Sequence, residues 1–460
     1  MADRWPTRRR DRNLCDDSPD IMLRALAIAV LAVSLQVDPM AALVTETRAL
    51  VEGLLSGRTA PLVQKFDERM AGALPVAQLA QAVTSVKQQA GEFRTITATR
   101  TQVRETVRIV VATCDFENGP VDVTVAWDEQ GRVVGLNMRP AAMVATYNPP
   151  PYVVADRFKE SAVTVDAGGW PLPGTLTMPR GDGPFPAVVL VHGSGPGDRD
   201  ATVGPNGPNR PFRDLAWGLA SRGIAVLRYD KRTLVHRERI ATLTAFTVKD
   251  ETVDDALAAV ALLRRTDGVR ADRIFVAGHS LGGMLAPRIG VADSTLAGLI
   301  VLAGAVRPLE DTILAQTRYL AELDGAVNTA ERELIAAAET VVAKARALKL
   351  GDPPLTGPLA SGPASYVIDL RGYHPPTVAA MLALPMLVLQ GERDYQVTMA
   401  DFGVWRTALA KRADVRFHSY PSLNHLFMAG TGPSSPAEYR QAGHVDEAVV
   451  RDIHAWISER

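Results

Sequence analysis

Apolar residues follow two different periods along the chain, and the change between them separates two folded regions. Within residues 41–140, apolar positions have helical spacing at 43–55 and 76–86, and extended segments follow at 93–101, 105–116, 121–127 and 133–138. The third of these segments alternates strictly, with apolar side chains at Val121, Val123, Val125 and Trp127. Helices followed by an antiparallel meander predict a small α+β domain, which we expect to serve in packing or association.

From about residue 155 the pattern changes to short apolar runs separated by helical segments. The runs at 187–191, 224–227, 274–277, 296–302 and 386–389 have no polar alternation, as is typical of strands buried on both faces. Helical patterns at 212–222, 250–264 and 401–411 lie between or after them, and a hairpin at 162–178 precedes them. Strands that alternate with helices predict a doubly wound, mostly parallel sheet over residues 155–460.

Residues 309–383 interrupt this alternation. Two amphipathic helices are predicted at 309–323 and 329–348, and Asn328 or Thr329 can cap the second. Its apolar stripe is predicted to contain Leu334, Ala338, Val341, Ala345 and Leu348. An insertion between two sheet strands indicates a helical cap over the end of the sheet, with helical filler as the alternative.

The segments outside these regions differ in composition. Residues 1–40 begin with a charged stretch that has the composition of a disordered tail. The apolar run at 25–37 is too short to span a bilayer and has the length of a signal-peptide core. The segment 22–37 therefore indicates export, while a first helix of the next domain in a cytoplasmic protein is the alternative. Residues 141–154 contain Pro149, Pro150 and Pro151 and predict a stiff linker.

Composition excludes several classes of function. Fifty basic residues balance fifty-one acidic residues, which argues against a nucleic-acid binder that relies on bulk charge. The two cysteines, Cys15 and Cys114, cannot form a disulfide framework or a zinc site, and no His/Cys cluster has metal-ligand spacing. We therefore expect no metal, no cofactor, no nucleic acid and no stable membrane span, and the sequence leaves a homo-oligomer open.

One short motif indicates chemistry. Residues 278–282 have the pattern G-x-S-x-G, directly after the apolar run at 274–277 and before a helical pattern that starts near Met284. A sharp turn from strand to helix would present the Ser280 hydroxyl above the edge of the sheet. We interpret His279, beside the serine, as a buried structural residue. The alternative for the motif is a glycine-rich turn with a solvated serine.

The partners that a nucleophilic serine needs follow later in the chain. A serine hydroxyl requires a base and a group that orients the base. Asp394 and His425 each follow the end of a predicted strand, and the carboxyl ends of parallel strands share one edge of the sheet. The order Ser280, Asp394, His425 is the one expected at such a turn. The backbone N–H groups of Leu281 and Ser194 are the predicted oxyanion donors.

Other titratable residues compete for the acid and base roles: Glu392, Asp401, His418 and His444. Asp401 begins a predicted helix, where capping is the ordinary role of an aspartate. His418 lies within a predicted strand, and we expect His444, which precedes a helix, to be solvated. Asp394 and His425 therefore remain the preferred pair.

The motifs at 192–196, 278–283, 391–397 and 423–427 together resemble those of the α/β-hydrolase superfamily, specifically bacterial carboxylesterases with a small N-terminal domain. The resemblance implies an α/β-hydrolase fold and a cofactor-free serine esterase that cleaves small-molecule esters with short acyl groups. Ser280 would form the acyl-enzyme, with His425 as base and Asp394 as orienting acid. The cap would limit acyl size through side chains such as Leu314 and Leu320. A serine peptidase or acyl-peptide hydrolase and a non-catalytic binding protein are the alternatives.

Overall fold

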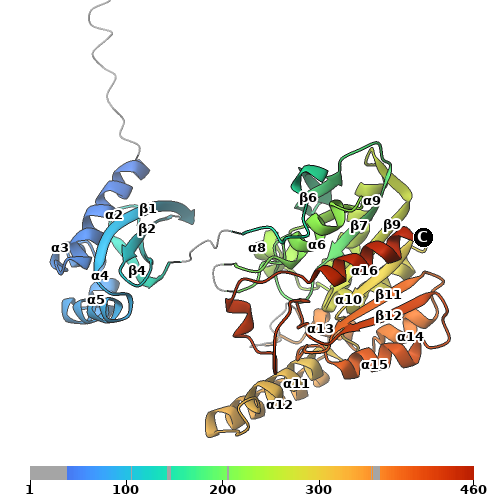
Figure 1. The fold of residues 1–460 in the computed structure, drawn as a ribbon. Coiled ribbons are helices and arrows are strands. Elements are labelled where there is room, and N and C mark those ends of the chain that lie inside the picture. Colours follow the sequence, from blue (N-terminus) through green and yellow to red (C-terminus); the bar gives the residue numbers. More distant parts are fainter. Residues whose placement is uncertain (1–38, 105, 142–146, 205–206, 354, 356–362) are drawn as a thin grey trace, which may run out of the picture. The chain divides into compact units, whose positions relative to one another are not determined.

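The structure is a computed structural model that describes residues 39–104, 106–141, 147–204, 207–353, 355 and 363–460. The chain divides into two compact units, residues 1–143 and 144–460 (Figure 1). The signal-like segment at 22–37 and residues 142–146 of the predicted linker lie outside the described residues. Within the part of the chain that is described, no helix is long and apolar enough to cross a membrane.

The first unit is a helical layer on an antiparallel sheet, as the meander pattern predicts. Its four strands pair in chain order, β1-β2-β3-β4. The apolar side of β3 is buried, and the indole of Trp127 donates a hydrogen bond of 3.0 Å to the hydroxyl of Thr47 on the first helix. The elements are α2 (Pro39–Leu55), α3 (Ala60–Val63), α4 (Glu68–Ala73), α5 (Val76–Ala90), β1 (Phe93–Arg104), β2 (Val107–Phe116), β3 (Val121–Trp127) and β4 (Val133–Pro140).

The second unit is built on an eight-stranded, mostly parallel sheet, as predicted. The strand order is β12-β11-β10-β9-β7-β8-β6-β5; β6 is antiparallel to both of its neighbours, β8 and β5, and the other neighbouring pairs are parallel. The strands are β5 (Phe158–Asp166), β6 (Pro171–Pro179), β7 (Phe185–Val191), β8 (Ala225–Tyr229), β9 (Val269–His279), β10 (Gly298–Leu302), β11 (Met386–Gly391) and β12 (Val415–Tyr420). This arrangement is the α/β-hydrolase fold.

Helices cover both faces of this sheet. Successive residues of β7 show the two layers, because Val188 and Leu190 pack against α6 and α16, whereas Val189 and Val191 face α9, α10 and α15. Burial on both faces explains why the central strands lack polar alternation. The helices are α6 (Pro211–Ala220), α9 (Asp254–Arg264), α10 (Leu281–Ala292), α14 (Pro375–Ala380), α15 (Met399–Ala408) and α16 (Glu447–Ser458).

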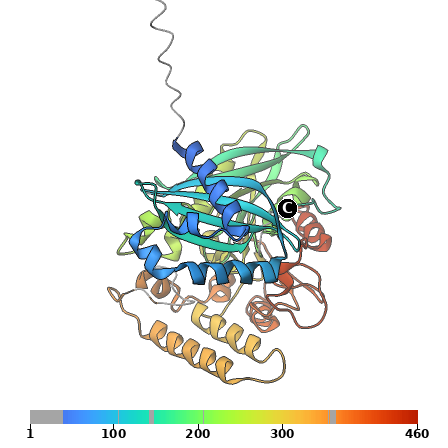
Figure 2. The ribbon, with the colours of Figure 1, turned by 90° about the vertical axis from the view of Figure 1, so that its left-hand side faces the viewer.

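The interruption between β10 and β11 is helical. Helices α11 (Leu309–Ala321) and α12 (Thr329–Ala347) lie side by side and project from the body of this unit (Figures 1 and 2), and α13 (Ala364–Leu370) follows. Asn328 caps α12 in a capping box with Glu331. Part of the proline-rich loop before α13 lies outside the described residues.

The predicted apolar stripe of α12 is wrong at one position. Leu334 is 62% exposed, whereas Val342, Ala345 and Leu348 are buried. Buried Ala345 and Leu348 belong to a cluster that includes residues of α11 and α13. The stripe therefore continues only where α12 has neighbours, because an apolar position is buried only if another element covers it.

Candidate active site

The turn at Ser280 has a strained backbone. The positions two residues before and two residues after the serine, Gly278 and Gly282, have no room for a Cβ atom. Ser280 lies between β9 and α10 with φ 55° and ψ −115°. A Cβ atom on Gly278 would lie 2.1 Å from the carbonyl oxygen of Gly282, and a Cβ atom on Gly282 would lie 2.5 Å from that of Val191. The two glycines of the motif are therefore required by close backbone approach.

Asp394 and His425 meet at the carboxyl ends of neighbouring strands. Asp394 follows β11, His425 follows β12, and His425 Nδ1 lies 2.6 Å from Asp394 Oδ2. Both residues are buried. The other carboxylate oxygen accepts hydrogen bonds from the backbone N–H groups of Gln396, at 2.8 Å, and Val397, at 3.0 Å. Because the carboxylate is fixed, it can hold the imidazole in one orientation with Nε2 directed away from the acid.

His279 supports the loop that carries His425. Its Nε2 donates to the carbonyl oxygen of His425 at 2.9 Å, and the two rings are 4.6 Å apart. Burial and the neighbouring His425 lower the pKa of His279 to about 3, so its ring is neutral. These contacts agree with the interpretation of His279 as a structural residue.

Ser280 and His425 line one cavity of about 370 Å³, together with Ser194. Between these described serine and histidine side chains the structure has no hydrogen bond. Such bonds are often long before substrate binds. The cavity thus brings the predicted nucleophile, base and oxyanion loop together without fixing the contact between nucleophile and base.

The predicted oxyanion donors lie on the two sides of Ser280. Leu281 is the first residue of α10, so its N–H has no acceptor within the helix. On the other side, a Cβ atom on Gly193 would lie 3.6 Å from Ser280 Oγ, which shows how closely this loop passes the hydroxyl. Ser194 follows Gly193 and lines the same cavity as Ser280.

The competing residues have other partners. Asp401 forms a capping box with Thr398 and accepts two hydrogen bonds from Arg307, at 3.0 and 2.8 Å. The hydroxyl of Ser419 donates to Glu392 at 2.7 Å, away from the Asp394–His425 pair. His418 is on the sheet and half-exposed, beside Asp452. His444, which was expected to be solvated, is partly exposed, and its Nδ1 lies 3.2 Å from the buried carboxylate of Asp214.

A larger cavity of about 610 Å³ extends from Ser280 beneath the inserted helices. Its walls come from the sheet loops, from α7 (Arg232–Val235), α8 (Arg237–Ala241), α10, α11 and α13. The residues that sequence reasoning missed here are Thr233, Arg237, Ile240, Glu251, Arg307 and Tyr366. They lie on short helices or loops, where no period of apolar residues could have revealed them.

The prediction that Leu314 and Leu320 of the cap limit acyl size is also wrong. Leu309, Thr312, Ile313 and Gln316 of α11 line the large cavity, whereas Leu314 and Leu320 do not, and Leu320 is 36% exposed. Positions spaced by three and four residues share one face of a helix. The lining residues form one such face. Leu314 falls off this face, whereas Leu320 continues it one turn beyond Gln316, where it no longer lines the cavity.

Two buried histidines near the site predict how stability depends on pH. Burial lowers the pKa of His192 to about 4 and that of His279 to about 3, whereas a histidine of the unfolded chain titrates near ~6.5. Below about pH 6.5 these two histidines bind protons in the unfolded chain but not in the folded chain, so the stability of the fold decreases as pH drops toward about 4. As pH is lowered, we expect the melting temperature of His279→Gln to fall less steeply than that of wild type, because the variant has one fewer histidine that must stay neutral.

The matched control for this prediction is His418→Gln, which replaces an exposed histidine on β12. Its melting temperature should follow the wild-type pH profile. Parallel profiles for wild type and His279→Gln between about pH 6.5 and pH 4 would contradict the assignment of a neutral, buried imidazole.

Comparison with known proteins agrees with this architecture. Residues 209–431 match the family described as serine aminopeptidase, S33, and residues 48–136 match a family described as protein of unknown function (DUF3887). Esterase EstD from Thermotoga maritima is 38% identical over 412 residues, which cover 90% of this chain and 94% of that protein.

Solved structures are similar to this chain at low identity. Est1E from Butyrivibrio proteoclasticus is 18% identical, with 65% of this chain and 98% of that chain covered and a TM-score of 0.42. A hyperthermophilic esterase from Pyrobaculum calidifontis is also 18% identical, with 69% of this chain and 88% of that chain covered and a TM-score of 0.43.

Among the described residues, no group of three or more His, Cys, Asp or Glu side chains could hold a metal ion.

Proposed function

This chain belongs to the α/β-hydrolase family that includes Esterase EstD, and from that premise we propose that it hydrolyses carboxylic esters through an acyl-enzyme on Ser280. The observation that carries the proposal is the shared cavity of Ser280 and His425, with His425 held by Asp394 at 2.6 Å. A strained serine at a strand-to-helix turn beside an imidazole–carboxylate pair has the components that acyl transfer requires.

The proposed reaction proceeds in two halves. His425 Nε2 takes the proton as Ser280 Oγ attacks the ester carbonyl, and the resulting imidazolium is stabilised by Asp394. The N–H groups of Ser194 and Leu281 donate hydrogen bonds to the oxyanion. His425 then protonates the leaving alcohol and activates the water that hydrolyses the acyl-enzyme. Apart from the substrate and one water molecule, each step uses only side chains and backbone groups of this chain.

Substrate class is tested with a panel of nitrophenyl esters and aminoacyl nitroanilides, because the family match includes serine aminopeptidases. We expect turnover of the esters and little or none of the nitroanilides. Preferential turnover of the nitroanilides would favour a peptidase, and no turnover of either class would favour a binding protein. Ser280→Ala measured in parallel removes the contribution of any contaminating hydrolase.

Polar groups on the wall of the large cavity favour short acyl chains. The volume of about 610 Å³ could hold a sizeable group, so volume alone does not set the limit. The polar lining residues are Thr233, Arg237, Glu251, Arg307, Thr312, Gln316 and Gln396. A short acyl group can be covered by the apolar side chains of α10 and α11, whereas a long aliphatic chain would also have to pack against these polar groups, where it buries less apolar surface. We therefore propose a preference for acetyl to butyryl esters over palmitoyl esters.

The apolar residues of α11 that line the cavity predict a change in this preference. Ile313→Ala should enlarge the space beside the acyl group and raise relative activity on hexanoyl and octanoyl esters by several-fold, with a smaller change in kcat for acetate. Leu314→Ala is the matched control, because Leu314 is on the same helix but does not line the cavity. Chain-length profiles that superimpose for wild type and Ile313→Ala would contradict the role of α11 as a cap.

A further inference from the structure

A buried lysine holds the two glycines of the loop that carries Ser194. Lys231 Nζ donates to the carbonyl oxygens of Gly193, at 2.8 Å, and Gly195, at 3.0 Å. It also lies 3.1 Å from a carboxylate oxygen of Glu251. The side chain of Lys231 is only 2% exposed, and these contacts occupy all three donors of its ammonium group.

Glu251 balances this buried charge and has its own partners. The hydroxyls of Thr233, at 2.6 Å, and Tyr366, at 2.5 Å, donate to its two oxygens. Glu251 lies in a π-helical turn, Lys249–Val253, where the sequence predicted an ordinary helix. Such turns occur often at functional sites, because the added residue redirects side chains. A buried ion pair is tolerated only when its remaining hydrogen bonds are satisfied, and here they are.

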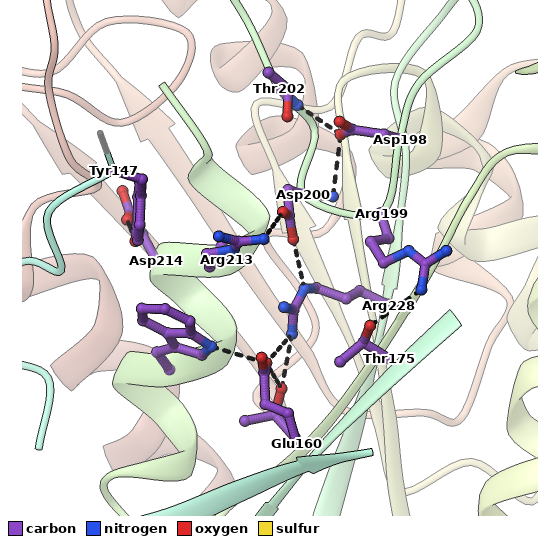
Figure 3. Close-up of polar contacts among 12 residues, drawn as sticks. Tyr147, Glu160, Thr175, Asp198, Arg199, Asp200, Thr202, Arg213, Asp214 and Arg228 are labelled. Atoms are coloured by element: carbon purple, nitrogen blue, oxygen red, sulfur yellow. Dashed lines mark hydrogen bonds and ion pairs between the residues drawn. The ribbon is translucent and has the colours of Figure 1, made fainter. Parts of the chain in front are cut away.

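The rest of this loop is held by a separate set of ion pairs. Arg199 pairs with Asp230 at 2.6 Å. Arg228, which is almost fully buried, donates to Asp200 at 2.8 Å, and Arg213 also pairs with Asp200 (Figure 3). These contacts fix residues 199–200 but do not reach the glycines beside Ser280. Gly193 and Gly195 have no side chains of their own to anchor that segment.

The planar peptide bond links the lysine contact to the oxyanion donor. The carbonyl of Gly193 and the N–H of Ser194 belong to one trans peptide unit, so they point in opposite directions within one plane. A carbonyl held toward Lys231 therefore directs the Ser194 N–H away from it. We infer that Lys231 is a positioning residue for the oxyanion hole, an inference that rests on the proposed esterase function. Glu251 and Tyr366 in turn fix Lys231, which connects α13 of the cap to this loop.

The first test removes the ammonium group in the full-length protein. Lys231→Met should lower kcat for nitrophenyl acetate by about 10²-fold, at the lower end of the loss seen when an oxyanion donor is removed. KM should change by less than about threefold, because the donor acts on the transition state more than on bound substrate. An unchanged kcat in folded Lys231→Met would overturn the inference.

Arg232→Met provides the matched control. Arg232 is the next residue, is equally buried and pairs with Asp255, but it contacts neither the glycines nor the large cavity. Both single variants should have lower melting temperatures, yet only Lys231→Met should lose kcat per folded molecule. Equal losses of kcat in the two variants would show a general effect of destabilisation and would overturn the inference.

A double variant separates the positioning role of Lys231 from its contribution to stability. It also covers the case in which Lys231→Met does not fold. In Lys231→Met/Glu251→Gln no buried carboxylate is left without its cation, so the melting temperature should recover toward the wild-type value. The kcat should stay low, because the carbonyls of Gly193 and Gly195 remain unheld. Recovery of kcat together with stability would overturn the positioning role. Absence of ester turnover in wild type and Arg232→Met would instead contradict the proposed function itself.

Discussion

Ser280→Ala is expected to lower kcat for nitrophenyl acetate by about 10⁶-fold, and His425→Ala by a similar factor. Without the hydroxyl no acyl-enzyme can form, and without the imidazole the hydroxyl keeps its proton. The double variant should lose little more than either single variant, because the two residues act as one unit. Residual activity above the uncatalysed rate would come from the oxyanion donors and substrate binding.

His418→Ala is the matched control for the histidine variant. It removes a half-exposed imidazole from the strand that precedes His425, so folding and the cavity should be preserved. The measurement is steady-state hydrolysis with purified proteins, with circular dichroism to confirm that each variant is folded. Strictly additive losses in Ser280→Ala and His425→Ala would show that the two side chains act independently, contrary to the proposed mechanism.

Asp394→Asn is expected to lower kcat by about 10⁴-fold. The carboxylate lies 2.6 Å from His425 Nδ1, and an amide at this position cannot both orient the ring and stabilise the imidazolium that forms in the reaction. Its hydrogen bonds from Gln396 and Val397 can be retained by an amide oxygen, so the fold should survive.

Asp401→Asn is the comparison that tests the identity of the acid. Asp401 accepts hydrogen bonds from Arg307 and from the N-cap residue of α15, so its loss should lower the melting temperature and leave most of the activity on acetate. If Asp394→Asn retained wild-type kcat while Asp401→Asn lost it, the assignment of Asp394 as the orienting acid would be wrong.

Local sequence was sufficient where one segment determines its own geometry. The apolar run before Gly278 predicts a buried strand, and the spacing of Gly278 and Gly282 around Ser280 predicts the turn. The close contact that requires glycine at 278 is local, with Gly282, whereas Gly282 itself lies against Val191 of the neighbouring strand. Asp394 and His425 could be found because the carboxyl ends of parallel strands converge. The pairing of α2 with β3 through Trp127 could not be foreseen, although the alternation that buries Trp127 could.

Contacts between distant segments account for what was missed. Lys231, Glu251 and Tyr366 come from three elements up to 135 residues apart, and none belongs to a recognisable motif. Their contacts depend on a π-helical turn that no propensity reveals. Similarly, the exposed Leu334 shows that a helical period identifies a face but not how far along the helix a neighbour covers it.

The most direct test of the central claim is covalent labelling of the nucleophile. Purified protein is treated with a serine-directed fluorophosphonate, and the site of the adduct is determined by peptide mass spectrometry while residual ester hydrolysis is followed. We predict one adduct per chain, on Ser280, with complete loss of activity and no labelling of Ser280→Ala. Full activity after stoichiometric labelling of Ser280, or inactivation through an adduct on another residue, would contradict the acyl-enzyme mechanism.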